Sequence, residues 1–198
     1  MMSLEDHIER ILWTEQQISE RVSELASQIS DYFKGSSSSI VVVGVATGAF
    51  LFLADIVRKI KLPVSVDLLR VESYGSGTES NGAPRISSDV KIDIKGKHVL
   101  LVEDIVDTGN TLTCVVSHLA SKGASSVSVC SFLDKPARRK VHIELVGEGK
   151  FYRGFEDKQT VEWVNRTVPF FSAVTAVHTQ KCLSQNWNLT GQSAYFIF

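Results

Sequence analysis

The sequence predicts an α/β domain in which a central, mostly parallel sheet is flanked by helices. Apolar runs at 40–45 and 99–102 carry this prediction, because runs without alternating polar residues are typical of strands buried on both faces. The segment 126–133, which also contains three serines, is expected to form the next parallel strand. A short polar loop and then an apolar helical pattern follow each of the first two runs, over 49–60 and 112–119. Strand–loop–helix units of this kind build parallel sheets.

The composition is that of an ordinary globular protein. The 198 residues are 43% hydrophobic and 22% charged, with a formal net charge of −1, which favours one domain with a substantial core. This charge gives no electrostatic basis for binding nucleic acid or membrane surfaces, and no apolar run reaches membrane-spanning length. The N-terminus is charged and amphipathic, unlike a signal peptide, and the three cysteines lack CxxC spacing. We therefore expect free thiols and a cytoplasmic protein.

An amphipathic helix is expected in the N-terminal part of the chain, where residues typical of a helix start and of a helix end flank an apolar pattern. Thr14 and Gln17 match a capping box, apolar residues keep helical spacing from Ile18 to Phe33, and Gly35 follows. We expect this helix to cover the sheet.

A strand over 64–71 and a long polar loop over 72–84 come after the helical pattern at 49–60. A loop of this length is typical of either a lid or a disordered insertion, and the residues alone do not separate these readings. Residues 85–93 are expected to form a short hairpin arm that returns to the sheet.

A second loop of functional interest follows the strand at 99–102. Glu103 and Asp104 come first, and the polar segment 107–111 then leads into a helix. Small residues, hydroxyls and free N–H groups at a helix start form an anion site, for which phosphate is the natural ligand. The two carboxylates instead suit ribose hydroxyls or Mg²⁺. Both groups lie at the carboxyl edge of the strands, where ligands bind, so the sequence predicts a ribose 5-phosphate site. An ordinary capped turn is the alternative, and three carboxylates at one edge disfavour it.

The segment Val102-Glu103-Asp104-Ile105-Val106-Asp107-Thr108-Gly109 resembles the phosphoribosyl pyrophosphate motif of type I phosphoribosyltransferases, in the version of the hypoxanthine-guanine enzymes. The resemblance implies the type I fold and transfer of a 5-phosphoribosyl group from phosphoribosyl pyrophosphate to hypoxanthine or guanine. Purine salvage would then yield IMP or GMP and pyrophosphate. It also implies a Mg²⁺ cofactor and a homo-oligomer, either a dimer or a tetramer.

Site residues follow from the same resemblance. It implies that Asp107 takes a proton from purine N7, and that Glu103 and Asp104 hold the ribose hydroxyls and the metal. The implied 5-phosphate site comprises Asp107, Thr108, Gly109, Asn110 and Thr111 with the neighbouring acids.

Two further loops match the family. The loop after 40–45 corresponds to the pyrophosphate loop, with Thr47 where the family often has Lys or Asn, followed by Gly48 and with a cis peptide implied between Ala46 and Thr47. Ser73 and Tyr74 match the start of the mobile loop that closes over the site, which favours the lid interpretation of 72–84.

Basic residues follow the strand at 126–133. Lys135 matches the family lysine that donates to the purine 6-oxo group, which disfavours an adenine or pyrimidine enzyme, and Arg139 matches an arginine near pyrophosphate. We interpret Arg138 and Lys140 as a solvated loop.

The resemblance extends through Glu156. Residues 157–198 lack the expected purine-stacking aromatic and second metal aspartate. We therefore expect a phosphoribosyltransferase domain at 1–156 with an incomplete or altered hood and a divergent tail at 157–198. An alternative is an inactive or impaired relative that binds phosphoribosyl pyrophosphate or nucleotide without turnover.

Overall fold

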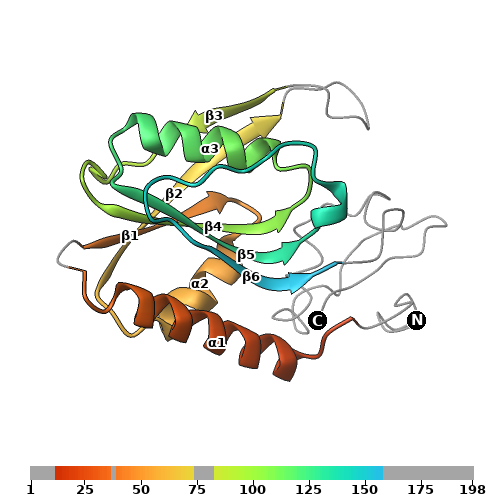
Figure 1. The fold of residues 1–198 in the computed structure, drawn as a ribbon. Helices are drawn as coiled ribbons and strands as arrows, with labels where there is room; N and C mark the ends of the chain where they lie inside the picture. Colours follow the sequence, from red (N-terminus) through yellow and green to blue (C-terminus); the bar gives the residue numbers. More distant parts are fainter. Residues whose placement is uncertain (1–11, 37–38, 74–82, 158–198) are drawn as a thin grey trace, which may run out of the picture. The chain divides into compact units, whose positions relative to one another are not determined.

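A six-stranded sheet organises the part of the chain that the computed structural model describes, namely residues 12–36, 39–73 and 83–157 (Figure 1). The elements in chain order are α1 (Glu15–Phe33), β1 (Ile40–Ala46), α2 (Phe50–Lys59), β2 (Val64–Ser73), β3 (Pro84–Ser88), β4 (His98–Val106), α3 (Asn110–Ser121), β5 (Ser126–Asp134), the single 3₁₀ turn η2 (Pro136–Arg138) and β6 (Phe151–Glu156). The described residues from Val22 onward belong to one compact unit.

The sheet has the strand order β3-β2-β1-β4-β5-β6. All neighbouring pairs are parallel except β2 with β3, which run antiparallel. The predicted mostly parallel sheet and the returning arm after the long loop are thus confirmed. Because β1, β4 and β5 run in the same direction, the loops that follow them meet at one edge of the sheet.

Burial on both faces characterises the central strands β1 and β5. Every residue of β5 is buried, as are the first six residues of β1. In Figure 1, α3 lies over one face of the sheet and α2 over the other. A strand with helices on both faces has no solvent-facing side, so β1 is apolar throughout and β5 buries even its serines, Ser126, Ser128 and Ser131.

The helix ends follow the expected signals. The Thr14 backbone N–H donates to Gln17 Oε1 at 2.8 Å, and the Gln17 N–H donates to Thr14 Oγ1 at 3.2 Å, which confirms the capping box. The buried face of α3 consists of the four residues predicted from their spacing, Leu112, Val115, Val116 and Leu119.

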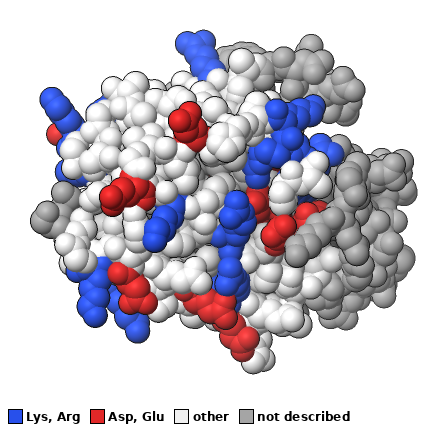
Figure 2. Space-filling model, in the orientation of Figure 1, with Lys and Arg blue, Asp and Glu red and all other residues white. Residues whose placement is uncertain are grey.

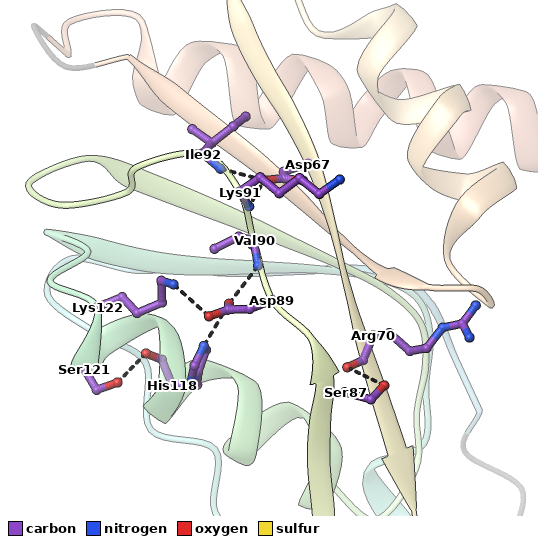
Figure 3. Close-up of polar contacts among 10 residues, drawn as sticks. All are labelled: Asp67, Arg70, Ser87, Asp89, Val90, Lys91, Ile92, His118, Ser121 and Lys122. Carbon is purple, nitrogen blue, oxygen red and sulfur yellow. Dashed lines mark hydrogen bonds and ion pairs between the residues drawn. The ribbon is translucent and has the colours of Figure 1, made fainter.

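Two aspartates fix the connection between β3 and β4 (Figure 3). Asp67 Oδ2 accepts from the backbone N–H groups of 91–92, at 2.6 and 2.8 Å. Asp89 lies opposite α3, where Oδ1 contacts His118 Nε2 at 2.9 Å and Oδ2 accepts from Lys122 Nζ at 2.7 Å. The arm that leads back from β3 is therefore tied both to β2 and to the last turn of α3.

Several expectations concern residues outside the described ranges. They include Tyr74, most of the long loop, Cys182 and the tail from 158 onward. Among the described residues, Cys114 and Cys130 are not in a disulfide bond, and no helix has the length and apolar character needed to span a membrane.

Candidate active site

The β4–α3 loop forms the centre of the site. Gly109 precedes α3 with a left-handed φ of +90° and has no side chain to cap the helix, while Thr108 Oγ1 accepts a long hydrogen bond of 3.4 Å from the Asn110 N–H. A Cβ on Gly109 would lie 2.9 Å from Arg139 Cδ and 3.1 Å from Val141 Cγ2, so both the conformation and the packing require glycine. The first N–H groups of α3 lack partners within the helix, and this uncapped end suits an anion.

Asp104 joins this loop to the loop after β1. A Cβ on Gly48 would lie 1.9 Å from Asp104 Oδ2, so the carboxylate packs directly against the glycine. Thr47 is exposed beside it, and the Ala46–Thr47 peptide bond is cis, as the family resemblance implied. The two loops that the sequence placed at one edge are therefore in contact.

Glu103 is more buried than a sugar-binding acid needs to be. The residue is 8% exposed, and its Oε2 is a buried atom without a hydrogen-bond partner. Burial raises the pKa of the Glu103 carboxyl well above its usual range, and the neighbouring Asp104 carboxylate adds to this rise. A protonated carboxyl can donate to a hydroxyl as well as accept from one.

Asp107 forms an ion pair with Arg138, for which the sequence predicts a place in a solvated loop. Arg138 Nε lies 2.5 Å from Asp107 Oδ1, and the arginine side chain is only 23% exposed. The solvated-loop interpretation of Arg138 is therefore wrong. The physical reason is the η2 turn, which directs the side chain back toward the end of β4.

Arg139 packs against the β4–α3 loop and pairs with a buried acid. Its Nη2 pairs with Asp134 Oδ1, and Asp134, which is 1% exposed, also accepts from Arg153 Nε at 2.8 Å. Among the described residues, the buried Nη1 of Arg139 has no hydrogen-bond partner. The Cδ of Arg139 packs against Gly109. The predicted contact of Arg139 with pyrophosphate stays a prediction. Asp134 could not be predicted as a site residue, because an acid at the end of a buried strand does not belong to any sequence motif that would identify its arginine partners.

Lys135 lies at the end of β5 and is 5% exposed. Burial lowers the pKa of its ammonium group, and the nearby Asp107 carboxylate opposes this shift. Its backbone N–H donates to the carbonyl of Val106 at 3.0 Å, which fixes the end of β5 beside the end of β4. A cation and a carboxylate from neighbouring strands thus lie close together at the sheet edge.

The structure brings together most of the predicted residues. They lie at the ends of β1, β4 and β5. Thr47 and Gly48 follow β1, and Lys135 and Arg139 follow β5. Glu103 and Asp104 belong to the last part of β4, the loop after it contains Asp107, Thr108 and Gly109, and α3 begins with Asn110 and Thr111. Ser73 ends β2 opposite Pro84 of β3, and Tyr74 lies outside the described residues. On the face shown in Figure 2, acidic and basic side chains are interspersed.

Two carboxylates define what the site could offer a metal ion. Among the described residues there is no group of three or more His, Cys, Asp and Glu side chains that could hold a metal. Mg²⁺ commonly binds one or two protein carboxylates together with substrate phosphates. Asp104 and Glu103, with its orphaned oxygen, fit such a substrate-bound ion rather than a site made by protein alone.

A parallel α/β sheet with an anion site at a helix start, adjacent carboxylates and a buried lysine defines the class of proteins that bind phosphorylated sugars and nucleotides. Residues 11–170 match the sequence family described as the phosphoribosyl transferase domain. This chain belongs to that family. The matched region continues beyond Glu156.

The similar proteins are named as hypoxanthine or hypoxanthine-guanine phosphoribosyltransferases. The hypoxanthine phosphoribosyltransferase of Haemophilus influenzae is 39% identical over 167 residues, which are 84% of this chain and 84% of that protein. The hypoxanthine-guanine phosphoribosyltransferase of Aquifex aeolicus is 45% identical, over 70% of this chain and 78% of that protein. A Bacillus anthracis hypoxanthine-guanine phosphoribosyltransferase structure aligns with a TM-score of 0.66 at 38% identity, covering 77% of this chain and 85% of that chain.

Proposed function

We propose that this protein transfers the 5-phosphoribosyl group of phosphoribosyl pyrophosphate to hypoxanthine or guanine and forms IMP or GMP in purine salvage. The observation that carries the proposal is the position of Lys135, whose N–H donates to the Val106 carbonyl at 3.0 Å and which therefore lies at the sheet edge next to Asp107 and the start of α3. The names of the relatives support the same substrates.

The ribose 5-phosphate is proposed to bind at the β4–α3 loop. The N–H groups of 109–111 and the hydroxyls of Thr108 and Thr111 would donate to its oxygens. Asp104 and Glu103 would hold the ribose hydroxyls from the adjoining strand end. Asp104 and Thr108 are close in the sequence. The ribose ring and the 5-phosphate that they would bind are also neighbouring parts of one substrate.

The purine is proposed to lie between Lys135 and Asp107. The Lys135 ammonium would donate to the 6-oxo oxygen, which hypoxanthine and guanine share and adenine lacks. Purine N9 forms the bond to ribose C1 as the bond from C1 to pyrophosphate breaks, and the N7 proton passes to the Asp107 carboxylate. A positioned carboxylate is suited to this transfer.

The pyrophosphate is proposed to leave beside the loop after β1. Thr47 and Gly48 lie there, Arg139 is the predicted cation, and a lid beginning at Ser73 and Tyr74 would exclude water. Mg²⁺ would be held by Asp104 and Glu103 together with substrate oxygens, and when bound it would neutralise the charge of the pyrophosphate.

We also propose a homo-oligomer. Three large apolar side chains on α2 and β2 are more than a third exposed: Phe50, Val66 and Leu68. They line one hollow with Leu53 and Val57. Exposed apolar surface of this kind favours association, and sedimentation equilibrium of the Phe50→Glu variant would show a lower mass than the unmodified protein.

The division of the chain at Glu156 is likewise a proposal. Residues 1–156 would form the phosphoribosyltransferase domain with an incomplete or altered hood, and residues 157–198 a divergent tail. Cys114 and Cys130, which are not joined in a disulfide bond, support the proposal of a cytoplasmic protein.

An assay of the purified full chain tests the proposed function. Hypoxanthine, guanine, xanthine and adenine are each supplied with phosphoribosyl pyrophosphate and Mg²⁺, and nucleotide is measured by chromatography. IMP and GMP should form much faster than AMP. Binding of phosphoribosyl pyrophosphate without any nucleotide product would contradict the proposal.

A further inference from the structure

Arg138 holds one oxygen of the Asp107 carboxylate. Its Nε lies 2.5 Å from Asp107 Oδ1, and 23% of the arginine side chain and 38% of the aspartate side chain are exposed. Among the described residues, Asp107 Oδ2 has no hydrogen-bond donor. The guanidinium therefore fixes one carboxylate oxygen and leaves the second free.

The backbone that carries Arg138 is itself fixed against the loop that carries Asp107. Within η2, the Arg138 N–H donates to the Lys135 carbonyl at 3.1 Å. Two residues later, the Lys140 N–H donates to the Thr108 carbonyl at 2.9 Å. Figure 1 shows η2 beside the loop that leads into α3. Arg138 thus reaches Asp107 from a short segment that is anchored on both sides.

The other described cation near Asp107 has a different position. Lys135 is almost fully buried at the end of β5, whereas Arg138 lies closer to the surface. Arg139 pairs with Asp134. Arg138 is consequently the arginine of this segment that contacts Asp107.

We propose that Arg138 is a positioning residue for Asp107, an inference that rests on the proposed phosphoribosyl transfer. A proton acceptor must lie within hydrogen-bond reach of the proton that it takes. An aspartate side chain has several rotamers, and the hydrogen bond to Oδ1 selects the one that presents Oδ2 to the purine. Without the guanidinium, Asp107 would occupy the productive rotamer for a smaller part of the time.

The test compares Arg138→Met and Arg138→Lys in the unmodified chain and in the Asp107→Asn variant. We expect Arg138→Met to lower kcat about tenfold and to change KM for phosphoribosyl pyrophosphate less than about twofold, because misplacement of a catalytic group by a fraction of an ångström reduces turnover. Arg138→Lys keeps the charge and should recover part of kcat. In the Asp107→Asn background, Arg138→Met should cause no further loss.

Arg58→Met is the matched control. Arg58 pairs with Asp55 at 2.6 Å on the surface of α2, so this variant removes the same kind of ion pair away from the site and should retain normal kcat. Thermal melting of each variant establishes that it is folded, and if Arg138→Met does not fold, Arg138→Lys supplies the same double-variant comparison.

The possible failures are distinguishable. Undiminished kcat in Arg138→Met, or an equal loss in the Asp107→Asn background, would overturn the role of Arg138 while the proposed function stands. Absence of nucleotide product from the unmodified chain would overturn the proposed function and this role together.

Discussion

The carboxylate of Asp104 lies so close to Gly48 that a Cβ added to the glycine would be 1.9 Å from Asp104 Oδ2. Contacts between real Cβ atoms and oxygen are never this short, so even the smallest side chain would displace the carboxylate or the loop. This contact links the proposed pyrophosphate loop to the proposed ribose-binding acid.

Gly48→Ala should therefore impair substrate binding. Displacement of Asp104 would misplace the carboxylate that we propose holds the ribose, and we expect KM for phosphoribosyl pyrophosphate to rise about tenfold. Steady-state kinetics check this value. Gly35→Ala is the control, because no atom lies within 4 Å of the added Cβ, and equal KM values for the two variants would contradict the structural link.

Asp107→Asn should separate turnover from binding. The amide cannot accept the purine proton as a carboxylate does, and general base catalysis is typically worth about 10²- to 10⁴-fold. We expect kcat to fall within this range while KM for phosphoribosyl pyrophosphate stays nearly unchanged. Equal losses in kcat and in substrate affinity would argue against a base at this position.

Lys135→Met should weaken discrimination between 6-oxo and 6-amino purines. A hydrogen bond from a charged group contributes about 1.5–3 kcal/mol, so kcat/KM for hypoxanthine should fall at least tenfold. The low activity with adenine should change little. Lys34→Met removes an exposed lysine and serves as the control. If kcat/KM of Lys135→Met fell equally for hypoxanthine and for adenine, Lys135 would not recognise the 6-oxo group.

Asp89 should contribute a pH-dependent part of the stability. Although burial alone raises the pKa of its carboxyl, the hydrogen bonds from Lys122 and His118 lower it to about 2. A lowered pKa stabilises the folded state fully above the unfolded pKa, and this stabilisation disappears as the pH falls from near 4 through about 2. The side chain is 40% exposed, so solvent screening limits the contribution to about 1 kcal/mol or less.

Urea unfolding of Asp89→Asn at several pH values measures this contribution. The variant should be less stable than the unmodified protein at pH 7, and the difference should narrow below pH 4. Asp55→Asn breaks an exposed pair on α2 and should have a smaller effect at pH 7. A difference for Asp89→Asn that is constant with pH would show that the carboxylate charge is not responsible.

The fold was accessible from the sequence where burial and local signals agreed. The run in β1 is apolar because both faces are covered, and the pair Thr14 and Gln17 identifies a helix start from side chains three residues apart. The phosphate-binding role of 107–111 stays a prediction, which rests on the chemistry of these residues and on their place at a strand end.

The site residues that were missed depend on tertiary geometry. Arg138 faces Asp107 only because η2 turns the chain back toward β4, and adjacent arginines in a sequence do not show which one turns inward. Asp134 is identified only by the two arginines that converge on it from different elements. The depth of Glu103 likewise depends on the strands beside β4.

A crystal structure of the full chain with IMP bound tests the central claim most directly. We expect the 5-phosphate to lie within hydrogen-bond distance of the N–H groups of 109–111. We also expect purine O6 to lie within hydrogen-bond distance of Lys135 Nζ. A nucleotide whose phosphate binds away from the start of α3, or whose O6 faces away from Lys135, would contradict the account.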